Sequence, residues 1–97
     1  MNPNSELTIK TKTIDMMEYA FICLRQFPKH EKFILGADIR KCMYTMLNLI
    51  IRASKKHHKK TTIQDLDIEI ATLVALVRLS FGLKYIDQRR YELWVRK

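Results

Sequence analysis

The chain has 97 residues, of which 47% are hydrophobic and 29% charged, a composition typical of one folded domain and not of a disordered or fibrous protein. Only two Gly and two Pro occur, and so few breakers favour long helices over many short strands. Eighteen Lys and Arg against ten Asp and Glu give a formal net charge of +8. This excess attracts polyanions, so it predicts nucleic acid as partner, with an anionic membrane surface or an acidic protein as alternatives.

The sequence also predicts where the protein resides. No apolar run reaches the roughly 18 residues of a membrane span, and the first ten residues, MNPNSELTIK, lack the apolar core of a signal peptide. Cys23 and Cys42 lie far apart at apolar helical positions and form no Cys-x-x-Cys pair. We therefore expect buried, reduced thiols and a soluble, cytoplasmic protein.

The first predicted helix follows a polar segment. Residues 1–12 are expected to form a flexible lead-in, and Thr13 is the predicted N-cap. Apolar residues then recur at helical spacing from Ile14 to Phe27. Pro28 ends this helix, because proline disfavours helical geometry in the residue before it.

The second predicted helix begins near His30 or Glu31 and runs to about Lys56. Its apolar residues alternate steps of four and three, which is the pattern of one packed face. Its polar residues follow the same rhythm, so the helix is amphipathic. The apolar set is Leu35, Ile39, Cys42, Met46, Leu49 and Ala53, and the polar set is Lys41, Thr45, Asn48, Arg52 and Lys55.

Two further helices are predicted after the second. Thr61 or Thr62 is expected to cap the third helix, and Thr62 with Asp65 has the spacing of a capping box. Gly82 is the expected C-cap. Asp87 is expected to cap a short fourth helix that reaches Val95. The third helix has a predicted core stripe of Ile63, Leu66, Ile70, Leu73, Val77 and Phe81.

Four helices joined by short connections predict an all-α fold, namely an antiparallel up-down four-helix bundle. The bundle is expected to form a single domain over residues 1–97. The fourth helix has only about three turns before Lys97, so part of the bundle groove is expected to stay open. Two explanations remain: the chain ends early, or a partner subunit covers the gap.

The run from Lys55 to Lys60 is the densest basic segment. Its ammonium groups repel one another, and phosphate would relieve that repulsion, although a solvated loop between helices is the alternative. Metal binding by His57 and His58 is disfavoured, because adjacent loop residues point in different directions and no further ligand is suitably spaced. Near phosphate these histidines would instead gain charge.

A second basic group lies near the end of the chain, where aromatic residues separate the cations. Such rings could stack on exposed bases, but a core or subunit-interface position is the alternative, and we favour it for Trp94. The cations are Lys84, Arg89, Arg90, Arg96 and Lys97, and the aromatic residues are Tyr85, Tyr91 and Trp94.

The sequence offers no basis for catalysis. It contains no Gly-rich phosphate loop, no nucleophile with a base at a recognisable spacing, and no metal-ligand motif. We therefore predict that the protein is not an enzyme and requires no cofactor.

Several short signatures carry a family resemblance. They are Phe27–Phe33 (FPKHEKF), Leu35–Arg40 (LGADIR), Val77–Leu83 (VRLSFGL), Ile86-Asp87 and Tyr91-Glu92. In this order they resemble the four-helix-bundle family that includes the accessory variability determinant (Avd) of diversity-generating retroelements. The same family includes proteins encoded in intervening sequences of bacterial large-subunit ribosomal RNA.

The resemblance implies a homopentamer with a basic surface that associates with a reverse transcriptase and its template RNA. Such a protein supports mutagenic cDNA synthesis without catalysis of its own. The alternative is the ribosomal-RNA branch of the family, whose members would be structural or protein-interaction modules without a direct retroelement role. The preference for RNA or DNA also stays open. The family usually continues the fourth helix with a glycine-containing segment and a further Trp, whereas the present sequence stops at Lys97, which is a departure from the family pattern. The candidate nucleic-acid-binding residues are Arg40, Lys41, Arg52, Lys55, Lys56, His57, His58, Lys59, Lys60, Arg78, Arg89 and Arg90.

Overall fold

The computed structural model describes residues 3–55 and 59–96, with side chains from residue 8 onwards. Its helices are α1 (Pro3–Leu24), α2 (Lys29–Lys32), α3 (Leu35–Lys55), α4 (Lys60–Gly82) and α5 (Gln88–Arg96). Every regular element within these ranges is helical, which confirms the predicted all-α fold class. None of these helices is both long enough and apolar enough to cross a membrane.

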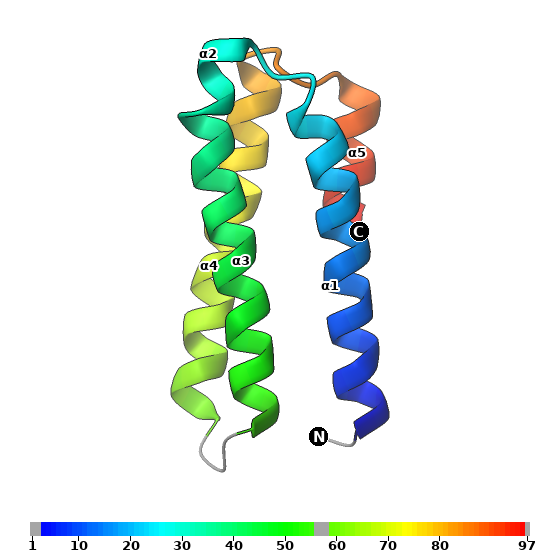
Figure 1. Ribbon diagram of the computed structural model, residues 1–97, viewed down its shortest axis with the longest axis vertical. Helices are drawn as coiled ribbons and strands as arrows, with labels where there is room; N and C mark the ends of the chain where they lie inside the picture. Colours follow the sequence, from blue (N-terminus) through cyan, green and yellow to red (C-terminus); the bar gives the residue numbers. More distant parts are fainter. Residues whose placement is uncertain (1–2, 56–58, 97) are drawn as a thin grey trace.

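The long helices lie along the long axis of the molecule (Figure 1). The chain ascends in α1, turns through α2, descends in α3, ascends in α4 and descends in α5. Helix α3 packs against α1 and α4, and α5 packs against the same two helices. Helix α5 has 9 residues whereas α4 has 23, so α5 covers only the upper part of the molecule as drawn.

The core lies among these helices. The predicted apolar face of α3 is confirmed, since all six of its residues are buried, as is Met43 beside them. Helix α1 contributes Met16, Ala20 and Cys23, while α4 contributes Leu73 and Val77. The predicted stripe of α4 is only partly correct, because Ile63 and Ile70 are 48% and 42% exposed.

The predicted start of the first helix at Thr13 is wrong, and the described part of the predicted lead-in is helical. Helix α1 begins at Pro3, and Pro is well tolerated at the first helical position because its missing N–H would be unsatisfied there anyway. Thr13 therefore lies inside the helix, where its Oγ1 donates a hydrogen bond of 2.8 Å to the Ile9 carbonyl oxygen. The segment was misread because it lacks apolar periodicity, although Glu, Leu and Lys are good helix formers.

The predicted second helix is divided into two. The short helix α2 ends at Lys32, and α3 begins only at Leu35. Arg40 Nη2 donates a hydrogen bond of 3.0 Å to the Lys32 carbonyl oxygen, so the α2 turn is held against α3. The predicted end at Lys56 lies outside the described residues.

The predicted capping box of α4 is also wrong. Lys59 occupies the N-cap position without a side-chain cap hydrogen bond. Thr62 lies within the helix and is buried. A buried Thr62 side chain is therefore part of the packing between helices.

The predicted C-cap of α4 is off by one residue, because Leu83 and not Gly82 is the C-cap. Lys84, and not Gly82, has the left-handed backbone, with φ of 65°. Tyr85 N donates to the Ser80 carbonyl oxygen at 2.9 Å and Lys84 N donates to that of Phe81 at 3.0 Å, the two hydrogen bonds of a Schellman motif. The predicted cap of the last helix is confirmed, since Asp87 Oδ1 accepts a hydrogen bond of 2.8 Å from Arg90 N.

Gly82→Ala should raise the free energy of unfolding by about 0.5–1 kcal/mol, because Gly82 is helical and glycine loses more backbone entropy than alanine on folding. A methyl group there would meet no atom within 4 Å. Urea unfolding of both proteins measures the change. A lower stability of the variant would show that Gly82 has a conformational role that its helical geometry does not reveal.

Candidate nucleic-acid interface

One side of α3 carries the polar residues Lys41, Thr45, Asn48, Arg52 and Lys55, here called the α3 polar stripe. Steps of four and three residues keep these side chains on one face, away from the buried face. The four besides Thr45 are exposed, and Thr45 is half-buried. At 1.5 Å per residue the stripe extends about 21 Å, and it contains no carboxylate.

A shallow groove of about 470 Å³ lies along the upper part of this stripe. Two of its lining residues, Arg40 and Lys41, are cations, and none is a carboxylate. The full lining is Ala37, Arg40, Lys41, Tyr44, Thr45 and Asn48. Anions therefore meet favourable charge in the groove without an acidic neighbour in its wall.

Tyr44 is the residue of this groove that sequence reasoning missed. Its side chain is 56% exposed, and the Phe21 ring of α1 supports it at a centroid distance of 6.1 Å and an interplanar angle of 45°. An exposed ring between cations is a stacking surface for an unpaired base. The available signal was an aromatic residue on the polar side of an amphipathic helix, three residues after Lys41.

Arg40 has a structural contact as well as a place in the groove. The residue is half-buried, and its guanidinium holds the Lys32 carbonyl oxygen. One N–H group is thereby occupied, whereas a guanidinium has five. Arg40 can therefore bind an anion only in the orientation that the α2 turn allows.

More cations lie where α3 ends and α4 begins, at the lower end of the molecule in Figure 1. Lys55 and Lys60 are exposed there, and Lys59 is half-buried at the N-cap of α4. The predicted residues Lys56, His57 and His58 lie outside the described residues. The α3 polar stripe therefore leads into the most basic segment of the sequence.

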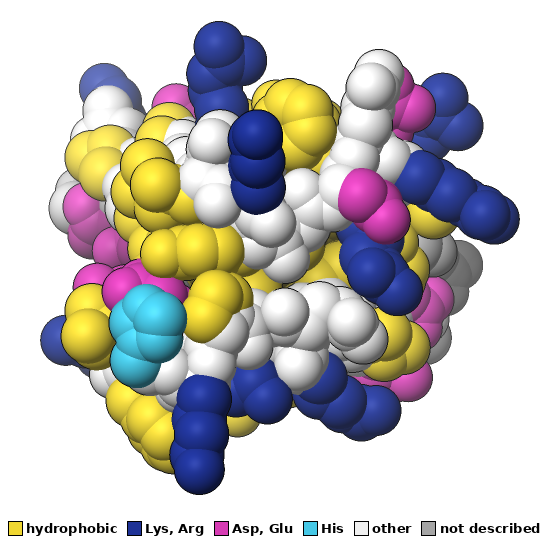
Figure 2. Space-filling view, turned by 90° about the horizontal axis from the view of Figure 1, so that it is seen from above, with side chains coloured by type: hydrophobic (Ala, Val, Ile, Leu, Met, Phe, Trp, Pro, Cys, Tyr) yellow, Lys and Arg dark blue, Asp and Glu magenta, His cyan; other side chains and the backbone are white. Residues whose placement is uncertain are grey.

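Arg78, Arg89 and Arg90 lie elsewhere. They belong to the second half of α4 and the first turn of α5, at the opposite end of the molecule from the α3–α4 connection. Arg90 Nη1 is 3.9 Å from Asp87 Oδ2, so it is partly neutralised. Figure 2, seen from above, shows Lys and Arg side chains scattered over this end, among hydrophobic, uncharged and acidic groups. The predicted residues therefore do not form one patch.

The aromatic residues near the end of the chain pack internally. Trp94 is 3% exposed, in agreement with the core position favoured for it. The Tyr91 ring stacks on Phe81 at 4.6 Å, and the Tyr85 ring lies tilted against Phe27 at 5.4 Å. Base stacking at these rings would require them to leave their partners.

The two cysteines are free and buried, as predicted. Cys42 Sγ donates to the Glu69 carbonyl oxygen at 3.2 Å and approaches Glu69 Oε2 at 3.3 Å. Burial, together with the Glu69 carboxylate, raises the pKa of Cys42 to about 12, and burial raises the pKa of Cys23 as well. Across residues 3–55 and 59–96, no three His, Cys, Asp or Glu residues are grouped so that they could hold a metal ion.

Cys42→Ser should change how stability depends on pH. The folded-state pKa of Cys42 lies above its ordinary value of 9.0, so its contribution is complete below pH 9 and is lost as pH rises towards 12. Serine does not titrate in this range. The stability difference between wild type and variant, measured by urea unfolding under reducing conditions from pH about 8 to about 11, should therefore shrink as pH rises. A difference independent of pH would contradict the raised pKa.

No curated protein and no solved structure is significantly similar to the chain. The sequence model of the bAvd-like family, in contrast, matches residues 7–97. This match covers nearly the whole chain, including the α3 polar stripe, and confirms the resemblance found in the sequence signatures. The chain belongs to the bAvd-like family.

Proposed function

We propose that the protein is a non-enzymatic, cytoplasmic accessory protein that binds nucleic acid and associates with a retroelement reverse transcriptase and its template RNA. In this role it supports mutagenic cDNA synthesis. The observation that carries the proposal is the α3 polar stripe, which is free of carboxylates and leads into the basic α3–α4 connection. Membership of the bAvd-like family supports the retroelement role.

In this proposal the fold is an antiparallel up-down four-helix bundle that presents cations along one face. Exposed cations bind phosphate weakly one at a time, and the released counterions supply much of the affinity. A homopentamer would repeat the stripe, and several weak contacts on one nucleic acid would then act together.

The first experiment is a titration of labelled single-stranded RNA and duplex DNA with the purified protein at several salt concentrations, with sizing of the free protein alongside. Binding by an oligomer, with affinity that falls steeply as salt rises, supports the proposal. Absence of binding at low salt contradicts it.

One observation favours a second function, a structural or protein-interaction module of the ribosomal-RNA intervening-sequence type. Helix α4 exposes large apolar side chains to an extent that suits a protein interface: Ile63, Ile68, Ile70, Val74 and Leu79 are 42–63% exposed. An oligomer that binds neither RNA nor DNA would support this function over the first.

Replacing Lys55, Lys56, Lys59 and Lys60 with Gln should weaken RNA binding with little effect on folding. If all four contact phosphates of a single strand, the slope of log affinity against log salt should fall by about 3. Fluorescence anisotropy at several salt concentrations measures this slope.

The matched control removes the same charge elsewhere, by replacing Arg25, Lys10, Lys29 and Arg96 with Gln. These residues are exposed and lie outside the α3 polar stripe. An equal loss in the control would show that net charge, and not position, governs binding.

Tyr44→Leu should weaken single-stranded RNA binding roughly five-fold or more, because base stacking on an aromatic ring contributes about 1–3 kcal/mol. Duplex DNA, whose bases are already stacked, should bind almost as before. Phe33→Leu is the control, since Phe33 is 75% exposed and lies outside the groove. An equal effect of Tyr44→Leu on RNA and duplex DNA would exclude stacking.

A further inference from the structure

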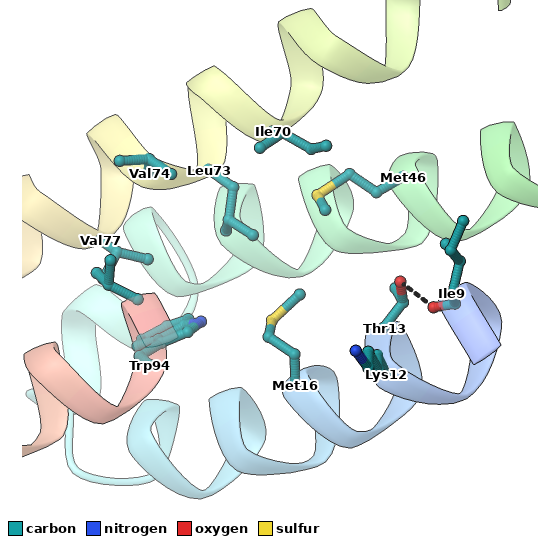
Figure 3. A pocket seen from close by; sticks show the side chains of 11 residues that line it. Ile9, Lys12, Thr13, Met16, Met46, Ile70, Leu73, Val74, Val77 and Trp94 are labelled. Atoms are coloured by element: carbon teal, nitrogen blue, oxygen red, sulfur yellow. Dashed lines mark hydrogen bonds between the residues drawn. The ribbon is translucent and has the colours of Figure 1, made fainter. Parts of the chain in front are cut away.

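A second, mostly apolar pocket lies where α5 ends. It has a volume of about 300 Å³ and is bordered by α1, α3 and α4, with Trp94 of α5 at one end (Figure 3). Met16, Met46, Leu73 and Val77 form much of its wall. A volume of this size is at the lower end of the range for small-molecule sites.

Trp94 has an unmet hydrogen-bonding requirement in this pocket. Its side chain is 3% exposed, and its Nε1 is buried without a hydrogen-bond partner among the described residues. Figure 3 shows the nitrogen edge of the indole facing the space that Met16 and Leu73 border. A buried N–H group without an acceptor costs free energy, so this end of the pocket favours an oxygen atom.

The other end of the pocket is more polar and more open. Thr13 lies there, but its hydroxyl donates to the Ile9 carbonyl oxygen, and Ile9 is 39% exposed. Lys12 is the only charged residue among the described lining residues, and it is exposed. This end therefore suits an anion.

We propose that the pocket binds a small amphipathic carboxylate that carries a neutral oxygen at its other end. The neutral hydroxyl or carbonyl oxygen accepts the Trp94 N–H, the apolar body lies among Met16, Met46 and Leu73, and the carboxylate pairs with Lys12. The carboxylate cannot occupy the Trp94 end, because an unpaired buried charge is far costlier than a neutral oxygen.

A helix from a partner protein satisfies these features less well. A helix interior uses its carbonyl oxygens in its own hydrogen bonds, so only a particular side chain could accept the Trp94 N–H. A small ligand with an apolar chain fills the space, and its neutral terminal oxygen accepts the Trp94 N–H directly. The pocket and the α3 polar stripe share no residue, so this site is independent of the proposed nucleic-acid binding. The pocket does share Ile70 and Val74 with the apolar surface of α4 that favours the second function.

The test uses the full chain, labelled with ¹⁵N. Trp94 is the only Trp, so one indole Nε1–H signal reports on the site. Titration with ω-hydroxydecanoate should shift this signal downfield in a saturable manner. Decanoate, which lacks the neutral oxygen, should bind about five-fold more weakly and shift the signal less, because one hydrogen bond is lost.

Two pairs of variants locate the site. Val74→Phe should reduce binding at least ten-fold by filling the pocket, whereas Leu79→Phe on the same helix should not, since Leu79 is exposed and outside the pocket. Lys12→Gln should weaken the binding of ω-hydroxydecanoate a few-fold and leave the binding of decan-1-ol, which has no carboxylate, unchanged. Lys10→Gln, outside the pocket, should change neither.

Three results would overturn the proposal. Absence of a saturable shift would mean that solvent alone occupies the pocket. Equal binding by the Val74→Phe variant would indicate unspecific adsorption. A shift that depends on protein concentration without ligand would assign the pocket to a second copy of the chain.

Discussion

The burial of one face of α3 against α1 and α4 is the constraint on which the rest of the structure depends. Ile39 and Met43 are fully buried, and the turns between them and Ala53 keep the same face towards the core. A helix that buries one face must present the other to solvent. The residues of the α3 polar stripe therefore lie in a row along the solvent-facing side of the helix. The α3 polar stripe is thus a consequence of the core, and it leads into the basic α3–α4 connection.

The short α5 is the second determinant. Its 9 residues reach only part of the length that α4 offers, and below its end Ile70 and Val74 of α4 are left partly exposed. Trp94 closes the upper core at this boundary. The same boundary leaves its indole N–H without an acceptor and opens the pocket towards Lys12. Ile70 and Val74 therefore belong both to the exposed apolar surface of α4 and to the wall of the pocket.

Sequence reasoning worked where a residue's environment is set by its own helix. The face of α3 was predicted correctly because about five turns of consistent spacing outweigh any local irregularity. Asp87 was predicted as a cap because the capping hydrogen bond joins residues only three positions apart. The break before Leu35 was missed because it depends on a contact from Arg40 back to Lys32. Ile70 was misplaced because its exposure depends on the neighbouring helices and not on the spacing within α4. The support of the Tyr44 ring was missed because it comes from Phe21 on another helix.

The positions of the cations restrict how a nucleic acid can be bound under the proposed function. The α3 polar stripe spans about 21 Å, half of the 42 Å length of the molecule, whereas Arg89 and Arg90 lie at the end away from the α3–α4 connection. A short nucleic-acid strand that lies along the α3 polar stripe as far as Lys60 does not reach these arginines. Only a longer strand, or one shared between copies of the chain, could contact both groups. The separation of the two groups therefore favours an extended ligand over a compact one.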